Sequence, residues 1–201
     1  MKRYIRSDTD GKNSDFEIRS DMYIQTLTKY SGNDDNVRVP SNVESISDTA
    51  FAKNTNIKSV YIPDTVRDLD EELFKDCVNL KSVRIPSNID YIPGGMFRGC
   101  TNLAKVIIPD KVGTIYYSAF RNCSSLKSIN LPKSVVWIQP GAFSGCTSLR
   151  YLNLNNVSSI DEYAFENCVS LREITIPESV HAIGVGAFKG CKNLVSVKCL
   201  S

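Results

Sequence analysis

Seven phenylalanines recur along the chain at intervals of 22 or 23 residues, and this spacing constrains the fold more than any other feature: Phe51, Phe74, Phe97, Phe120, Phe143, Phe165 and Phe188. Other residues keep the same interval, so that the repeated unit is V-x-x-I-x-x-x-A-F-x-x-C-x-x-L-x-x-V-x-I-P. Seven such units occupy residues 42–201. A unit of this length cannot bury its own apolar residues, so neighbouring units must stack. The spacing therefore predicts a solenoid.

The end of each unit, L-x-x-V-x-I-P, predicts one short strand in every coil, because apolar and outward residues alternate there. A 23-residue unit with this pattern has the length and spacing of a leucine-rich repeat. The A-F-x-x-C-x-x-L arc lacks such alternation and predicts a short helical or 3₁₀ turn. We therefore expect a leucine-rich repeat solenoid, curved and right-handed, of the α/β or β kind. Its short strands would line the concave face and its short helical or 3₁₀ turns would lie outside.

The sequence pattern A-F-x-x-C-x-x-L-x-x-V-x-I-P resembles the BspA-type leucine-rich repeats, which are common in bacterial surface proteins and in some protists. The resemblance covers about four fifths of the chain. Three units depart from the pattern: the first has Asn54 in place of cysteine, the sixth lacks one residue and has Asn155 in place of proline, and the last lacks the proline. The resemblance implies adhesion or protein recognition, and it supplies no catalytic residues.

Residues 1–41 differ in kind from the repeats. Two segments within them, 15–19 and 22–27, alternate apolar and polar residues as strands do. A third, Val37 to Pro40, matches the strand and proline of a repeat but lacks the preceding Phe and Cys. We expect residues 1–41 to form an N-terminal β-hairpin or meander that caps one continuous domain of seven repeats, 42–201.

Six of the seven cysteines belong to the repeat, each three residues after a phenylalanine. A ladder of thiols could serve redox chemistry or a metal, but tight pairs such as C-x₂-C are missing from the sequence. Cysteine also serves as a small buried hydrophobe, and we expect these thiols to be buried, reduced and inert. The single histidine, His181, has no base or nucleophile placed beside it by the repeat. We predict a protein that is not an enzyme, with no cofactor and no metal site.

The outward positions of the predicted strands form the candidate binding face. They carry eight basic residues and one acid, Glu173, although the net charge of the whole chain is only +2. Tyrosines and asparagines lie among these charges, a mixture more typical of a protein-contact surface than of a phosphate-binding track. The candidate ligand-binding residues are Lys58, Tyr61, Lys81, Arg84, Lys105, Lys127, Asn130, Arg150, Tyr151, Asn153 and Arg172.

Two interpretations of this basic face remain open. It binds an acidic protein segment, a glycan with acid groups or a nucleic-acid backbone, or it is a solvated edge whose lysine and arginine stems cover the sheet. The first makes the chain a protein-recognition module; the alternatives are a cell-surface adhesin for a host protein or glycan, and a structural spacer. Nucleic acid is not the expected partner. We expect no membrane partner, since no apolar run approaches the length of a membrane helix.

Five aromatic residues fall outside the apolar columns and form either an exposed patch or a cover lying flat over adjacent repeats: Tyr91, Tyr116, Tyr117, Trp137 and Tyr163. The last predicted strand, 196–200, would present unpaired backbone and apolar residues at its edge, which predicts self-association there. The polar first residues predict a cytoplasmic protein if the chain is complete as given. A signal upstream would instead place it at the cell surface or outside the cell.

Overall fold

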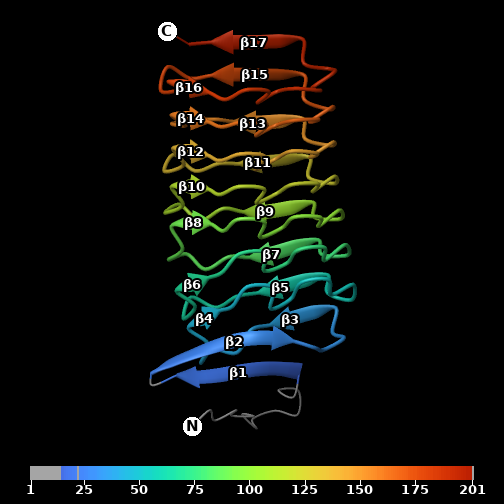
Figure 1. The fold of residues 1–201 in the computed structure, drawn as a ribbon, viewed down its shortest axis with the longest axis vertical. Helices are drawn as coiled ribbons and strands as arrows, with labels where there is room; N and C mark the ends of the chain where they lie inside the picture. The colour runs from blue at the N-terminus through green and yellow to red at the C-terminus, as the bar shows by residue number, and fades with distance from the viewer. Residues whose placement is uncertain (1–14, 22, 201) are drawn as a thin grey trace.

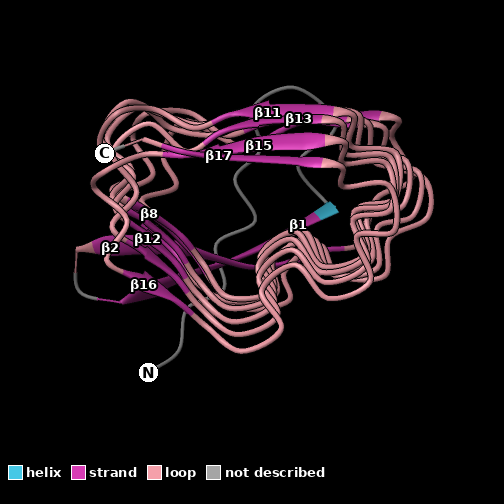
Figure 2. Cartoon of the chain, turned by 90° about the horizontal axis from the view of Figure 1, so that it is seen from above, coloured by secondary structure: helices cyan, strands magenta, loops and turns pink. Residues whose placement is uncertain are grey.

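The computed structural model describes residues 15–21 and 23–200, and in this part the chain winds into a stack of coils, each about one repeat long (Figure 1). Seen along the stack, successive coils superpose closely (Figure 2). The coils form a β-solenoid, as the repeat predicts. No helix in the described residues is long and apolar enough to span a bilayer.

One face of the stack is built from the predicted V-x-I strands, and we call it the front sheet. Neighbouring strands pair in parallel with Val60 opposite Val83 and Val83 opposite Val106, because equivalent residues lie one period apart. The backbone ladder joins β3 to β9, β11 to β13, and β15 to β17 as three segments. The strands are β3 (Asn36–Arg38), β5 (Ser59–Tyr61), β7 (Ser82–Arg84), β9 (Lys105–Ile107), β11 (Ser128–Asn130), β13 (Tyr151–Asn153), β15 (Glu173–Ile176) and β17 (Ser196–Cys199).

A second set of parallel strands lies across the core from the first, and we call it the back sheet (Figure 2). Its backbone ladder has two segments, one from β2 to β6 and one from β8 to β16. The V-x-x-I segment of each repeat supplies a strand of only two residues. So short a strand shows no alternation of apolar and polar residues, and the sequence therefore did not predict it. Its strands are β2 (Ile24–Tyr30), β4 (Ser45–Ile46), β6 (Asp68–Leu69), β8 (Tyr91–Ile92), β10 (Thr114–Ile115), β12 (Trp137–Ile138), β14 (Ser159–Ile160) and β16 (Ala182–Ile183).

The arc between the sheets consists of turns rather than a continuous helix. Single i→i−3 hydrogen bonds occur, as from the Cys77 amide to the Phe74 carbonyl, 3.0 Å. Other amides bond to the next coil, as Phe74 does to the carbonyl of Met96 at 2.9 Å. A left-handed residue before each of the six repeat cysteines, such as Asp76 with φ 58° or Gly99 with φ 75°, also interrupts any helical path. The predicted 3₁₀ turns are therefore present only as isolated turns.

The phenylalanine column forms the centre of the core. Ring centroids of successive coils lie between 5.1 and 5.7 Å apart from Phe51 to Phe188, and every pair is stacked. The column continues below the first repeat, where the Tyr30 ring lies 5.5 Å from Phe51 and 4.9 Å from Phe16. Tyr30 thus occupies the phenylalanine position of the N-terminal segment.

The six repeat cysteines are buried and unbridged, and each thiol donates a hydrogen bond to a phenylalanine carbonyl of the preceding coil. The Cys123 sulfur, for example, lies 3.1 Å from the Phe97 oxygen. The first repeat has no phenylalanine coil before it, and there the Asn54 amide donates instead to the Gly32 carbonyl at 3.1 Å. The longer side chain at this position therefore has a structural reason.

The N-terminal segment contributes to both sheets. Strand β1 (Phe16–Asp21) pairs antiparallel with β2 in a hairpin, β2 pairs in parallel with β4, and β3 pairs with β5. The predicted hairpin thus extends the back sheet, and the segment at Val37 begins the front sheet. Residues 1–14 of the predicted cap lie outside the described residues.

Candidate protein-binding surface

The outward side of the front sheet gathers the residues that the sequence predicts for binding. The strands alternate, so that Val60, Val83, Val106 and Ile129 point into the core while their neighbours face solvent. Arg84 is half-buried, and the other ten predicted residues are exposed: Lys58, Tyr61, Lys81, Lys105, Lys127, Asn130, Arg150, Tyr151, Asn153 and Arg172. They follow one another over β5 to β15, as the period requires.

Most of the positive charge on this surface has no carboxylate partner. Lys58 pairs with Asp35 at 2.6 Å, and Arg84 pairs with Asp64 at 2.6 Å. Within residues 15–21 and 23–200, the other five predicted cations form no ion pair: Lys81, Lys105, Lys127, Arg150 and Arg172. The front sheet therefore presents a column of available cations, and we call these five residues the basic column.

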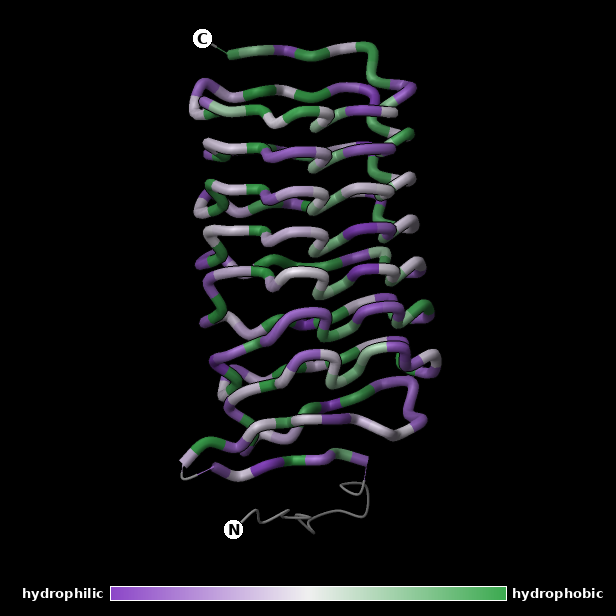
Figure 3. The backbone as a smooth tube through the Cα atoms, viewed as in Figure 1, coloured by the Kyte–Doolittle hydropathy of each residue, from purple (hydrophilic) through white to green (hydrophobic). Residues whose placement is uncertain are grey.

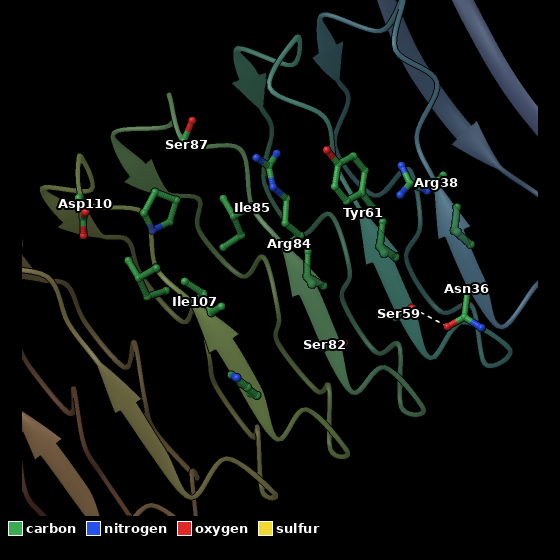
Figure 4. A pocket seen from close by; sticks show the side chains of 16 residues that line it. Asn36, Arg38, Ser59, Tyr61, Ser82, Arg84, Ile85, Ser87, Ile107 and Asp110 are labelled. Atoms are coloured by element: carbon green, nitrogen blue, oxygen red, sulfur yellow. Dashed lines mark hydrogen bonds between the residues drawn. The ribbon is translucent and has the colours of Figure 1, made fainter.

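A groove of about 880 Å³ crosses the N-terminal half of the front sheet, over strands β3 to β9 (Figure 4). Its central feature is the Tyr61 ring, which lies between two guanidinium groups. The carbon of the Arg38 guanidinium is 4.4 Å from the ring centroid, and that of Arg84 is 5.1 Å from it. Ile107, which is 68% exposed, provides apolar surface in the same groove. The groove thus joins positive charge to aromatic and aliphatic contact area.

The two arginines differ in how many of their guanidinium donors are free to bind a ligand. Arg84 donates to the Asp64 carboxylate and, at 2.7 Å, to the Ile62 carbonyl. The hydrogen bond from Arg84 and those from Ser87 lower the pKa of Asp64 to about 2, so this pair stays charged through the neutral range. Arg38, in contrast, makes no side-chain hydrogen bond or ion pair to any other described residue. Its guanidinium donors are therefore available beside the ring.

Arg38 and Ile107 are groove residues that the predicted set does not contain, and Arg38 was missed because it falls in the segment assigned to the cap. The signal was present, since Arg38 lies one period before Tyr61 and pairs with it in the ladder. A second hollow, of about 400 Å³, lies over the C-terminal half of the sheet and has a more polar lining that includes Asn130, Tyr151, Asn153 and Lys198. The predicted residues thus divide between two hollows and the basic column beside them.

Eight parallel front strands of one period, a stacked phenylalanine core and an exposed sheet face define a leucine-rich repeat solenoid. The model of the BspA type leucine-rich repeat region matches residues 28–149 and 113–201. The chain belongs to the BspA-type leucine-rich repeat family. Repeats of this family usually mediate protein–protein interaction or adhesion and are generally non-catalytic.

Solved structures of bacterial leucine-rich repeat proteins are similar to this chain. The T. pallidum leucine-rich repeat protein is 27% identical, with a TM-score of 0.82 over 94% of this chain and 91% of that one. A leucine-rich repeat protein from Eubacterium ventriosum is 25% identical, with a TM-score of 0.75 over 90% of this chain and 51% of that one. One from Bacteroides ovatus, at 20% identity and a TM-score of 0.71, covers 96% of this chain and 77% of that chain and shares the fold. A search of curated proteins finds no significant match.

Proposed function

We propose that this protein is a non-catalytic recognition module that binds an acidic protein segment on its front sheet. The observation that carries the proposal is the Arg38–Tyr61–Arg84 stack in the groove, continued by the unpaired cations of the basic column. A carboxylate of the partner would bind the free donors of Arg38, and a neighbouring apolar side chain would pack on Tyr61 and Ile107. Such mixed aromatic and arginine surfaces are typical of protein–protein contacts.

Charge reversal on the front sheet tests this proposal. We expect the triple variant Lys81→Glu, Lys127→Glu, Arg150→Glu to bind a labelled peptide of Asp, Glu, Leu and Tyr at least tenfold more weakly. Three lost pairs at about 0.5 kcal/mol each account for this factor. For the native chain, affinity should fall as salt rises, because the contacts are exposed. Fluorescence anisotropy at several salt concentrations measures both effects.

A matched control carries the same change in net charge elsewhere. Lys111, Lys133 and Lys192 are exposed and lie outside the front strands, so their reversal to glutamate should leave peptide binding near the native level. A Tyr61→Ala variant then asks whether the groove itself takes part. Binding that is insensitive to salt and to the front-sheet reversal would contradict the proposal.

We also propose weak association through the last coil. The last coil carries hydrophobic residues along its strand, as the earlier coils do (Figure 3). Their side chains are exposed where the counterparts in earlier coils are buried: Val197 is 55% exposed, whereas Val60 is 3% exposed. Unpaired strand edges and apolar surface favour pairing with another chain. This association would be apolar, and therefore insensitive to moderate salt.

A charged residue on the last coil is expected to abolish this association. We predict that Val197→Lys together with Cys199→Ser reduces the apparent mass in light scattering under reducing conditions, relative to Cys199→Ser alone. A native chain that remains strictly monomeric at high protein concentration would show that the last coil is protected.

A further inference from the structure

The back sheet is an unpartnered face whose charge is opposite to that of the front sheet. From β4 onward, its strands, the residue before each strand and the three residues after it carry nine carboxylates and one fixed cation, Arg67. The front strands and the residue before each of them, from Lys58 onward, carry eight cations and one carboxylate. The net charge of the whole chain is small because the charges of an anionic face and a cationic face nearly cancel. The nine carboxylates are those of Glu44, Asp48, Asp68, Asp70, Glu71, Glu72, Asp90, Asp161 and Glu162.

Aromatic side chains are exposed among these carboxylates, so the rings form a patch rather than a closed cover. Trp137 is 43% exposed and Tyr117 is 42% exposed. Their polar atoms are bound by carboxylates of other coils: Trp137 Nε1 donates to Asp161 at 2.7 Å, and the Tyr117 hydroxyl donates to Glu71. These bonds hold the rings in place, and a face fixed in this way loses little conformational entropy on binding.

Most carboxylates of the back sheet lack a cationic partner. Among the residues that the structure describes, only Glu72 of the nine forms ion pairs, with Lys75 and Arg98. Burial and the neighbouring carboxylates of Asp68, Asp48 and Glu71 raise the pKa of Asp70. Repulsion of this kind is relieved when a cationic surface approaches.

The front sheet supplies a surface with the matching charge and the matching spacing. Each full repeat contributes one strand to the front sheet and one to the back sheet, so charges on the two faces recur with the same coil-to-coil distance. Two copies placed side by side can therefore bring several cations of one front sheet to the carboxylates of the other copy's back sheet. Lysine or arginine side chains would also meet the exposed faces of Trp137 and Tyr117.

We infer that a second copy of this chain docks its cationic front sheet on the anionic, aromatic back sheet of the first. The two surfaces differ, so the contact is heterologous, and repeating it produces open chains of molecules rather than a closed dimer. Docking would also cover the front-sheet groove. The inference depends only on the charges of the two faces, and it stands or falls independently of the proposed acidic partner.

A charge-swap experiment tests this contact. The front variant reverses Lys81, Lys127 and Arg150 to glutamate, and the back variant reverses Asp48, Asp90 and Glu162 to lysine. All six side chains are exposed and make no side-chain hydrogen bond to another described residue, so the fold should tolerate the changes. We expect the native chain to associate at about 0.01 M salt and to be at least tenfold weaker in association at about 0.1 M. Each variant alone should be monomeric, because its altered face then carries almost no net charge. The front sheet of the front variant has five cations and four carboxylates, and the back sheet of the back variant has six carboxylates and four cations.

The equimolar mixture of the two variants provides the decisive measurement. It should associate again in sedimentation velocity, as pairs, because the unaltered front sheet of the back variant then finds the unaltered back sheet of the front variant. The emission of Trp137, the single tryptophan of the chain, should change in the same mixture and not in either variant alone. A native chain that is monomeric at low salt, or a mixture that stays monomeric, would overturn the inference. So would association that persists in each variant and resists salt, which would point to the last coil.

Discussion

Replacing Phe120 by alanine is expected to lower the free energy of unfolding by about 3–5 kcal/mol, as a large cavity in a close-packed core does. Phe120 is fully buried, and its ring lies 5.2 Å from Phe97 and 5.1 Å from Phe143. The cavity would therefore weaken the stacking of both neighbouring coils, and in a solenoid such damage spreads along the stack. Denaturant unfolding followed by circular dichroism measures the loss.

Two further variants keep this prediction testable. Ile107→Ala removes an exposed apolar side chain of the adjacent front strand and should cost below about 0.5 kcal/mol, as surface changes usually do. Phe120→Leu retains most of the volume and should fold if the alanine variant does not, at a cost below about 1.5 kcal/mol. A loss under about 1 kcal/mol for Phe120→Ala would remove Phe120 from the core, and would invalidate the alignment of repeats that places it there.

Alkylation of the folded protein is expected to label one cysteine, Cys199, and to leave the other six intact. Cys199 is exposed, whereas the repeat cysteines are buried. Burial raises the pKa of Cys77 and of Cys146 to about 12. Against the usual value of about 8.5, such a shift reduces the reactive thiolate more than a thousandfold at neutral pH. Mass spectrometry after brief exposure to iodoacetamide counts the labelled sites.

The unfolded chain supplies the control for this measurement. In denaturant all seven cysteines should react at similar rates, and Cys199→Ser should remove nearly all labelling of the folded protein. Rapid native labelling of Cys123 or Cys146 would show that the coils open locally or that the thiols serve a reactive purpose. Reducing conditions are needed throughout, because an exposed cysteine can join two chains.

The sequence was most informative where one residue type repeats at one distance. Moving along the chain by one period leads from Phe97 to Phe120 and from Val60 to Val83. The repeat spacing alone therefore predicts the core column, the parallel register and the face on which each front residue lies. The burial of the cysteines follows as well, because each keeps the same offset from its phenylalanine. The candidate residues on the front sheet were placed correctly for this reason, although their role in binding stays a prediction.

Other features depend on contacts between coils that a single unit does not specify. The back strands of the repeats are two residues long, and only the backbone hydrogen bonds to neighbouring coils make them a sheet. The arc forms turns instead of a helix, because its amides donate to the next coil and left-handed residues interrupt it. The segregation of acids to the back sheet became visible only once that sheet was known.

By itself, the sequence determined the solenoid, its period, its core columns and the basic character of its front strands. It could do so because residues one period apart must occupy equivalent places in successive coils. The tertiary structure alone decided that Arg38 and Arg84 enclose Tyr61, that Asn54 bonds to Gly32 where the cysteine column ends, and that Trp137 is held by Asp161. Each of these is a contact between side chains or backbone groups of different coils. Such contacts depend on side-chain rotamers and on which group comes within hydrogen-bonding distance, and the spacing of residue types does not contain that information.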